Sequence, residues 1–297
     1  SIRYFKKMNI KVNFTSKSTK ANTANCIVFV KDDKIQNKIF TPVKKSVLES
    51  QLFKDDLFTQ KEISNSNYIF VNCKKILNSF DYENIGSKLF DYLKKNKIEN
   101  CYIDTNKIDF THDQIEKIVH GAKLKSYNFN IYKSNNKKNN YINLDVVGKQ
   151  ISKSKDLRRN LDALLDGIFL TRDLVSEPGN ILHPDEYAKR LIKLKKIGLK
   201  VTVYNEKKLK HLGCNSLLGV GQGSIRGSYL VTIEWKGKKS KSKPLAFVGK
   251  GVCFDTGGIS LKPAKFMEDM TYDMAGSAVV VGLMKNFALR KAKINAV

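Results

Sequence analysis

The sequence has little of what small secreted domains and membrane proteins are built from. Its 5 cysteines are odd in number, far apart and without a C-x-x-C pair. This spacing excludes a disulfide framework and a zinc knuckle, and it favours a reducing compartment. No apolar run approaches the roughly 18 residues of a membrane span, and no hydrophobic signal core opens the chain. We therefore expect a soluble, cytoplasmic protein with no membrane partner.

Acidic residues are also scarce, since 28 Asp and Glu face 54 Lys and Arg and leave a net charge of +26. Such an excess would suit a polyanionic partner. The excess is mostly lysine, is spread widely, and accompanies abundant asparagine and isoleucine, a combination found in proteins from AT-rich genomes. Composition therefore allows a nucleic-acid partner without requiring one.

The first half of the chain alternates apolar runs with amphipathic stretches. A length of 297 residues with 41% apolar residues suffices for two domains with cores of their own. Short β-branched or aromatic runs predict strands at 25–31, 67–73, 100–104 and 141–147, and one-sided apolar stripes predict helices at 83–97 and about 113–123. We therefore predict an α/β domain with a mixed or parallel sheet over residues 1–150.

The second half repeats this pattern after a polar, asparagine-rich loop at 132–140. A long helix at about 155–176 is expected to join the domains, and residues 151–297 to form a second α/β domain. Within that domain we expect helices at 183–197, 206–212 and 274–290 and strands at 200–204, 229–235 and 245–248. The last of these helices is apolar nearly all round and is expected to be buried.

Two nucleotide-binding motifs are missing. The glycine cluster Gly219–Gly223 lacks the G-x-G-x-x-G spacing, and a strand rather than a helix follows it, which argues against a dinucleotide loop. No glycine run continues into the Lys-Ser/Thr of a P-loop.

The densest chemistry lies between Val248 and Met274, where glycine-rich turns carry Lys250, Asp255, Lys262 and Asp273. Two carboxylates offer hard oxygen ligands to divalent metals, and adjacent cations would favour the neutral amine of a lysine. The same residues also fit ordinary roles: a solvated lysine, a helix-capping Asp273, or a turn at Asp255.

Other reactive side chains in the sequence do not form a site. Cys253 fits a small buried residue rather than a nucleophile, because nothing nearby would activate it. The four histidines are scattered and without ligand spacing.

The segment VGKGVCFDTGGISLKPAKFMEDMTYDMAGSA, Val248–Ala278, closely resembles the metal-site segment of the cytosolic leucyl aminopeptidases, the M17 metallopeptidases. Further resemblance lies in RDLVSEPGNILHPDEYA and GCNSLLGVGQGSIRGSYLVTIEW, and more weakly in HGAKLKSYNFNIYKS. It is strong from about residue 156 to 297, whereas the first domain fits only in size and α/β pattern.

This resemblance implies a smaller N-terminal α/β domain, a C-terminal catalytic domain with two divalent ions, manganese or zinc, and a homo-hexamer acting on peptides. Lys250 and Asp273 would be ligands of one metal, Asp255 would bridge both, and Lys262 would be an electrostatic catalyst. The implied reaction is the release of N-terminal amino acids, preferably leucine-like, by metal-activated water.

The sequence departs from the family pattern in one respect, because it stops before the second motif, N-T-D-A-E-G-R. We therefore expect a C-terminally truncated chain, with an incomplete catalytic domain, that is inactive or nearly so on its own. Two other interpretations stay open: a basic nucleic-acid-binding protein on the same fold, and an inactive pseudo-enzyme.

Overall fold

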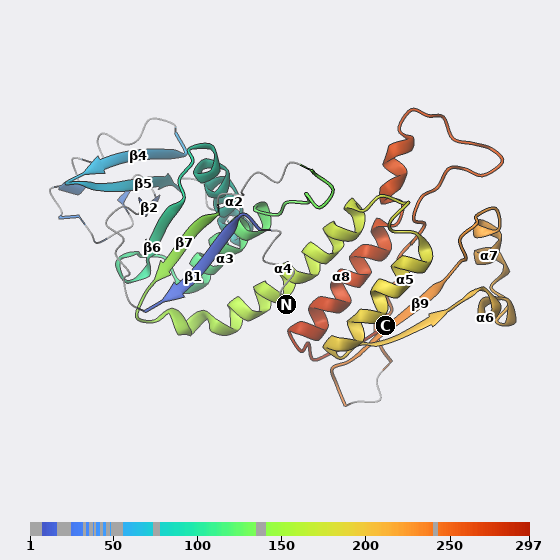
Figure 1. Ribbon diagram of the computed structural model, residues 1–297. Coiled ribbons are helices and arrows are strands. Elements are labelled where there is room, and N and C mark those ends of the chain that lie inside the picture. Colours follow the sequence, from blue (N-terminus) through green and yellow to red (C-terminus); the bar gives the residue numbers. More distant parts are fainter. Residues whose placement is uncertain are drawn as a thin grey trace. The chain divides into compact units, whose positions relative to one another are not determined.

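The computed structural model describes residues 8–16, 25–31, 34–35, 38, 40–41, 44–45, 48, 56–73, 78–134, 141–239 and 243–297. The chain divides into two compact units, Ser1–Leu161 and Asp162–Val297, and the division falls within helix α4 (Lys155–Ser176). Helices and sheet occur in both units, so the predicted α/β class is confirmed (Figure 1). In the described part of the chain, no helix is long and apolar enough to cross a membrane.

The first unit is organised by a mixed sheet. Its strands are β1 (Ile10–Thr15), β2 (Asn25–Lys31), β3 (Lys34–Ile35), β4 (Phe58–Ile63), β5 (Ser66–Asn72), β6 (Asn100–Asp104) and β7 (Ile142–Val147). They lie in the order β1-β7-β6-β2-β5-β4, with β3 beside β2. The first five in this order pair in parallel, whereas β3 and β4 are antiparallel to their neighbours.

Strand β2 is apolar on both faces because both faces of the sheet are covered at this position. Ile27 and Phe29 belong to the core cluster that includes helices α2 (Ser79–Lys95) and α3 (His112–Lys125). Cys26, Val28 and Val30 belong to a second cluster. A period of two along the strand separates the two sets. This explains the continuous apolar run in its sequence.

Helices α2 and α3 pack against each other at unusually close range. A Cβ built on Gly86 would lie 1.8 Å from the Ile118 carbonyl oxygen, and one built on Gly121 would lie 1.9 Å from that of Glu83. Only glycine allows the two backbones to approach this closely. Each helix begins with a capping box, from Asn78 in α2 and from Thr111 in α3.

The second unit contains three main helices and a small antiparallel sheet. The helices are α4, α5 (Pro184–Ile192) and α8 (Ala275–Leu289), and the sheet has the order β10-β9-β8, from β8 (Lys200–Tyr204), β9 (Leu230–Lys236) and β10 (Asn295–Ala296). Helices α4 and α8 cross where a Cβ on Gly167 would lie 2.5 Å from the Gly282 oxygen. Short helices α6 (Glu206–His211) and α7 (Asn215–Gly221) connect β8 to β9.

Four expectations need correction or limitation. The predicted strand at 245–248 is wrong. Only Leu245 forms a β-bridge, to Ala296, and the backbone hydrogen bonds with the residues around Ala296 are too few to make a strand. Helix α8 is not buried all round, since Val279 is 57% exposed. The helix predicted over 183–197 ends earlier, as α5 followed by the 3-10 turn η4 (Lys193–Ile197). Residues 135–140 of the predicted polar loop lie outside the described residues.

Candidate metal centre

The turn Gly249–Gly251 is fixed against the first turn of α8. The Ser277 amide donates a hydrogen bond of 2.8 Å to the Lys250 carbonyl oxygen. A Cβ on Gly249 would lie 2.5 Å from the Ser277 Cα, so only glycine fits there. Tyr187 of α5 supports this arrangement, because its hydroxyl lies 3.0 Å from the Ser277 hydroxyl. The backbone that carries Lys250 is thus held by two helices.

Lys250 reaches Asp273, the residue two positions before α8. Its Nζ lies 2.9 Å from Asp273 Oδ1. The other carboxylate oxygen, Oδ2, is buried, and among the described residues it has no hydrogen-bond partner. Asp273 does not cap α8, whose N-cap residue is Met274. A buried carboxylate oxygen without a donor is the position at which a cation could bind.

A second ion pair joins Asp255 to Lys262. Lys262 Nζ lies 3.0 Å from Asp255 Oδ2, and the Gly257 amide donates to Oδ1 at 2.9 Å. These two hydrogen bonds lower the pKa of Asp255, chiefly the one from Lys262, and the charge of Lys250 adds to the effect. The carboxylate of Asp255 is therefore ionised at neutral pH.

The loop between Asp255 and Lys262 folds back on itself. Gly257 has φ +95°, a conformation that favours glycine, and the Lys262 amide donates to the Thr256 carbonyl at 2.9 Å. This turn returns Lys262 to the carboxylate seven residues earlier. Its Nζ also lies 3.0 Å from the sulfur of Met270.

The four predicted site residues therefore form two ion pairs, Lys250 with Asp273 and Asp255 with Lys262. The charge of Lys250 links the pairs, because it acts on Asp255. Two carboxylates, one with a partnerless buried oxygen, fit part of a divalent-metal site. Within the described ranges, no group of three or more His, Cys, Asp or Glu side chains gathers around one point. These residues could thus supply some of the ligands that two ions need, but not all of them.

Cys253 lies between Lys250 and Asp255 in the sequence and is inert. It is 7% exposed, its Sγ lies 3.8 Å from the Gly251 carbonyl oxygen, and burial raises the pKa of its thiol to about 11. A thiol with this pKa is protonated at neutral pH and is a poor nucleophile. The interpretation of Cys253 as a small buried residue is confirmed.

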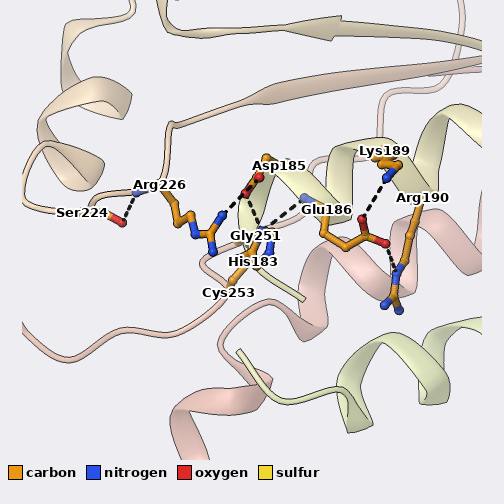
Figure 2. Close-up of polar contacts among 9 residues, drawn as sticks. All are labelled: His183, Asp185, Glu186, Lys189, Arg190, Ser224, Arg226, Gly251 and Cys253. Atoms are coloured by element: carbon orange, nitrogen blue, oxygen red, sulfur yellow. Dashed lines mark hydrogen bonds and ion pairs between the residues drawn. The ribbon is translucent and has the colours of Figure 1, made fainter. Parts of the chain in front are cut away.

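A polar network beside this region was not predicted as such (Figure 2). His183 is the N-cap of α5: its Nδ1 accepts from the Glu186 amide at 3.4 Å and also contacts the Asp185 carboxylate. Arg226 Nη1 lies 3.5 Å from Asp185 Oδ2. The network ties the turn at Ser224–Arg226, which follows the glycine cluster, to the start of α5. In the sequence, the residues His-Pro-Asp indicated the start of a helix at this position, but not the network.

Comparison with known proteins identifies the family. Residues 169–297 match the model of the cytosol aminopeptidase family, catalytic domain. A probable cytosol aminopeptidase of Brucella anthropi is 43% identical over 229 residues, which cover 74% of this chain and 46% of the relative. The chain belongs to the cytosol aminopeptidase family. The resemblance predicted from Val248–Ala278 is confirmed, and all four candidate site residues lie within the matched catalytic domain.

Solved structures share the fold of this aminopeptidase-family chain. A mutant of tomato leucine aminopeptidase has a TM-score of 0.73 at 19% sequence identity. The match covers 97% of this chain and 61% of the tomato chain. The bottromycin maturation enzyme BotP, in complex with Mn, has a TM-score of 0.71 at 20% sequence identity. The match covers 93% of this chain and 58% of the BotP chain. The chain spans about half the length of the curated relatives it matches, 46% for the Brucella protein.

Proposed function

We propose that the complete protein is a metal-dependent aminopeptidase that releases N-terminal amino acids, preferably leucine-like ones, from peptides. The observation that carries this proposal is Asp273, whose buried Oδ2 has no donor among the described residues while its Oδ1 pairs with Lys250. The family resemblance extends the proposal to two manganese or zinc ions and to a homo-hexamer in the cytoplasm. The Mn complex of BotP supports manganese.

Each of the four residues has a proposed role. Divalent ions, when bound, supply a water of lowered pKa and polarise the scissile carbonyl. Asp273 and the neutral amine of Lys250 would hold one ion, and Asp255 would bridge both. Lys262 would keep its proton and donate to the oxygen that becomes negative in the transition state. The Gly257 turn, which holds Lys262 beside Asp255, supports this proposed role.

The proposal predicts a difference between the complete gene product and residues 1–297. The complete protein should hydrolyse leucyl anilide, lose this activity on chelation, and regain it with Mn²⁺ or Zn²⁺. Residues 1–297 alone should release no leucine, because two carboxylates are too few ligands for two ions. Activity that chelation does not affect would contradict metal dependence, and an inactive complete protein would favour the pseudo-enzyme.

Replacing Lys262 with Met should slow the chemical step. Loss of one donor to a developing oxyanion lowers kcat by roughly 10²- to 10³-fold. KM should change little, because the interaction strengthens only in the transition state. Steady-state kinetics of the complete protein measure both constants. Lys262→Arg keeps the positive charge and should restore part of kcat; equal losses in the Met and Arg variants would argue against a role for charge.

A further inference from the structure

Ser277, in the first turn of α8, is bonded to the backbone beside both residues that would hold one of the two ions. Its amide donates to the Lys250 carbonyl oxygen at 2.8 Å. Its hydroxyl donates to the Met274 carbonyl oxygen at 2.8 Å, and Met274 directly follows Asp273 in the chain. Neither bond uses the Lys250 amine or the Asp273 carboxylate, which pair with each other. One serine thus connects the two backbone segments that bring the proposed ligands together.

The hydroxyl of Ser277 is oriented by Tyr187 of α5. The two hydroxyl oxygens lie 3.0 Å apart. Ser277 has a single hydroxyl proton, which it donates to Met274, because a carbonyl oxygen can only accept. The hydrogen bond between the two hydroxyls is therefore donated by Tyr187. Burial raises the pKa of the Tyr187 phenol to about 12, so this donor keeps its proton at neutral pH.

Tyr187 is itself held firmly in the second unit. Its side chain is 6% exposed and belongs to the same core cluster as Met274 and Ala278. Three residues further along α5, Arg190 pairs with the buried Glu177 at 2.8 Å. A phenylalanine in place of Tyr187 would keep the ring in this core and remove only the hydroxyl. The role of the hydroxyl can therefore be separated from that of the ring.

Groups that do not touch a metal often decide how well its ligands are placed, and their loss typically lowers metal affinity by 10- to 100-fold. We propose that Tyr187 and Ser277 are positioning residues that set the divalent-ion affinity of the Lys250–Asp273 pair, with Tyr187 acting through Ser277. The inference rests on the proposed function, because it takes Lys250 and Asp273 as ligands of one ion. Without the bond from Tyr187, the Ser277 hydroxyl is free to leave Met274, and the two ligand-bearing segments are held together less well.

The test measures metal binding directly in the complete, metal-free protein. Titration with MnCl2, with the unbound ion followed by electron paramagnetic resonance, gives the dissociation constants. Tyr187→Phe should raise the dissociation constant of one Mn²⁺ by about 10-fold, and Ser277→Ala should do the same. The matched control is Tyr82→Phe in α2. Tyr82 is 8% exposed, and its hydroxyl accepts from Gln114 at 2.7 Å, so the control removes a similarly buried hydroxyl from the first unit and should leave Mn²⁺ binding unchanged.

The double variant Tyr187→Phe/Ser277→Ala tests whether Tyr187 acts through Ser277. If it does, the double variant should bind Mn²⁺ as weakly as Ser277→Ala alone, because the two losses are not additive. Losses that multiply would mean that Tyr187 reaches the site by another route, and would overturn the proposed pathway. A purely structural role would lower the melting temperature of metal-free Tyr187→Phe below that of Tyr82→Phe and leave its Mn²⁺ affinity normal, which would also overturn the proposal.

Failure of this inference and failure of the proposed function give different results. A complete wild-type protein that binds no Mn²⁺ would overturn both. Normal Mn²⁺ binding by Tyr187→Phe, in a protein whose wild type binds Mn²⁺ and hydrolyses leucyl anilide, would overturn only the positioning role. Weakened binding by Tyr187→Phe, in a protein without leucyl-anilide turnover, would support the positioning role and contradict the peptidase activity.

Discussion

Replacing Asp255 with Asn is expected to abolish the proposed peptide hydrolysis by the complete protein and to leave the protein folded. Asp255 is the proposed bridging ligand, so its loss should lower kcat/KM by more than the loss of a single oxyanion donor does. We expect a decrease of about 1,000-fold or more. Folding should survive because the side chains of Asp255 and Lys262 are each 38% exposed. An ion pair this exposed contributes about 1 kcal/mol or less.

The matched control for Asp255→Asn is Glu268→Gln, which removes an exposed carboxylate from the neighbouring 3-10 helix η5 (Met267–Tyr272). Leucyl-anilide turnover and bound metal, measured by elemental analysis, should both fall in the Asp255 variant and stay normal in the control. Normal turnover in folded Asp255→Asn would remove Asp255 from the site.

Replacing Arg158 with Ala is expected to have the largest effect on stability. Glu116 of α3 is 3% exposed, and its Oε1 accepts from Arg158 Nε at 2.8 Å, from Arg158 Nη2 at 2.5 Å and from the Ser154 hydroxyl at 2.7 Å. The guanidinium also lies 3.4 Å from the centre of the Phe14 ring. Removing Arg158 leaves a buried carboxylate without its counter-charge, which costs about 3 to 5 kcal/mol.

The neighbouring Arg159 provides the control, because its pair with Asp156 has side chains that are 65% and 85% exposed. Arg159→Ala should cost at most about 1 kcal/mol. Urea unfolding monitored by circular dichroism gives both free energies. If Arg158→Ala destabilises the chain no more than Arg159→Ala, the buried pair does not stabilise the fold.

Periodicity predicted the elements whose environment is uniform along their length. Helices α2, α3 and α4 have one-sided apolar stripes, and β2 is apolar on both faces. Strands β1 and β4 were missed because they lie at the two edges of the sheet, where β4 has four consecutive polar residues, Thr-Gln-Lys-Glu, and is only partly buried. Edge strands owe their place to backbone pairing with a neighbour, and a single sequence carries little signal for that.

The candidate site depended on a different kind of information. Its residue types alone were equally compatible with turns, caps and solvated lysines, and the family resemblance singled them out. Lys250 and Asp273 are 23 positions apart, and they meet because the Gly249 turn packs on the first turn of α8. Contacts between distant segments of this kind depend on packing, which no local pattern encodes.

The close crossing of α2 and α3 also affects which mutations the gene can tolerate. Any missense change of a glycine codon adds a Cβ, and at Gly86 and Gly121 that atom would overlap a backbone oxygen of the opposite helix. Elsewhere in this core, Leu89 or Ile118 could be exchanged for another aliphatic residue at modest cost. At the two glycines, even alanine, the smallest replacement, forces the helices apart. These codons are therefore expected to accept synonymous changes only, although neither residue contributes a side chain.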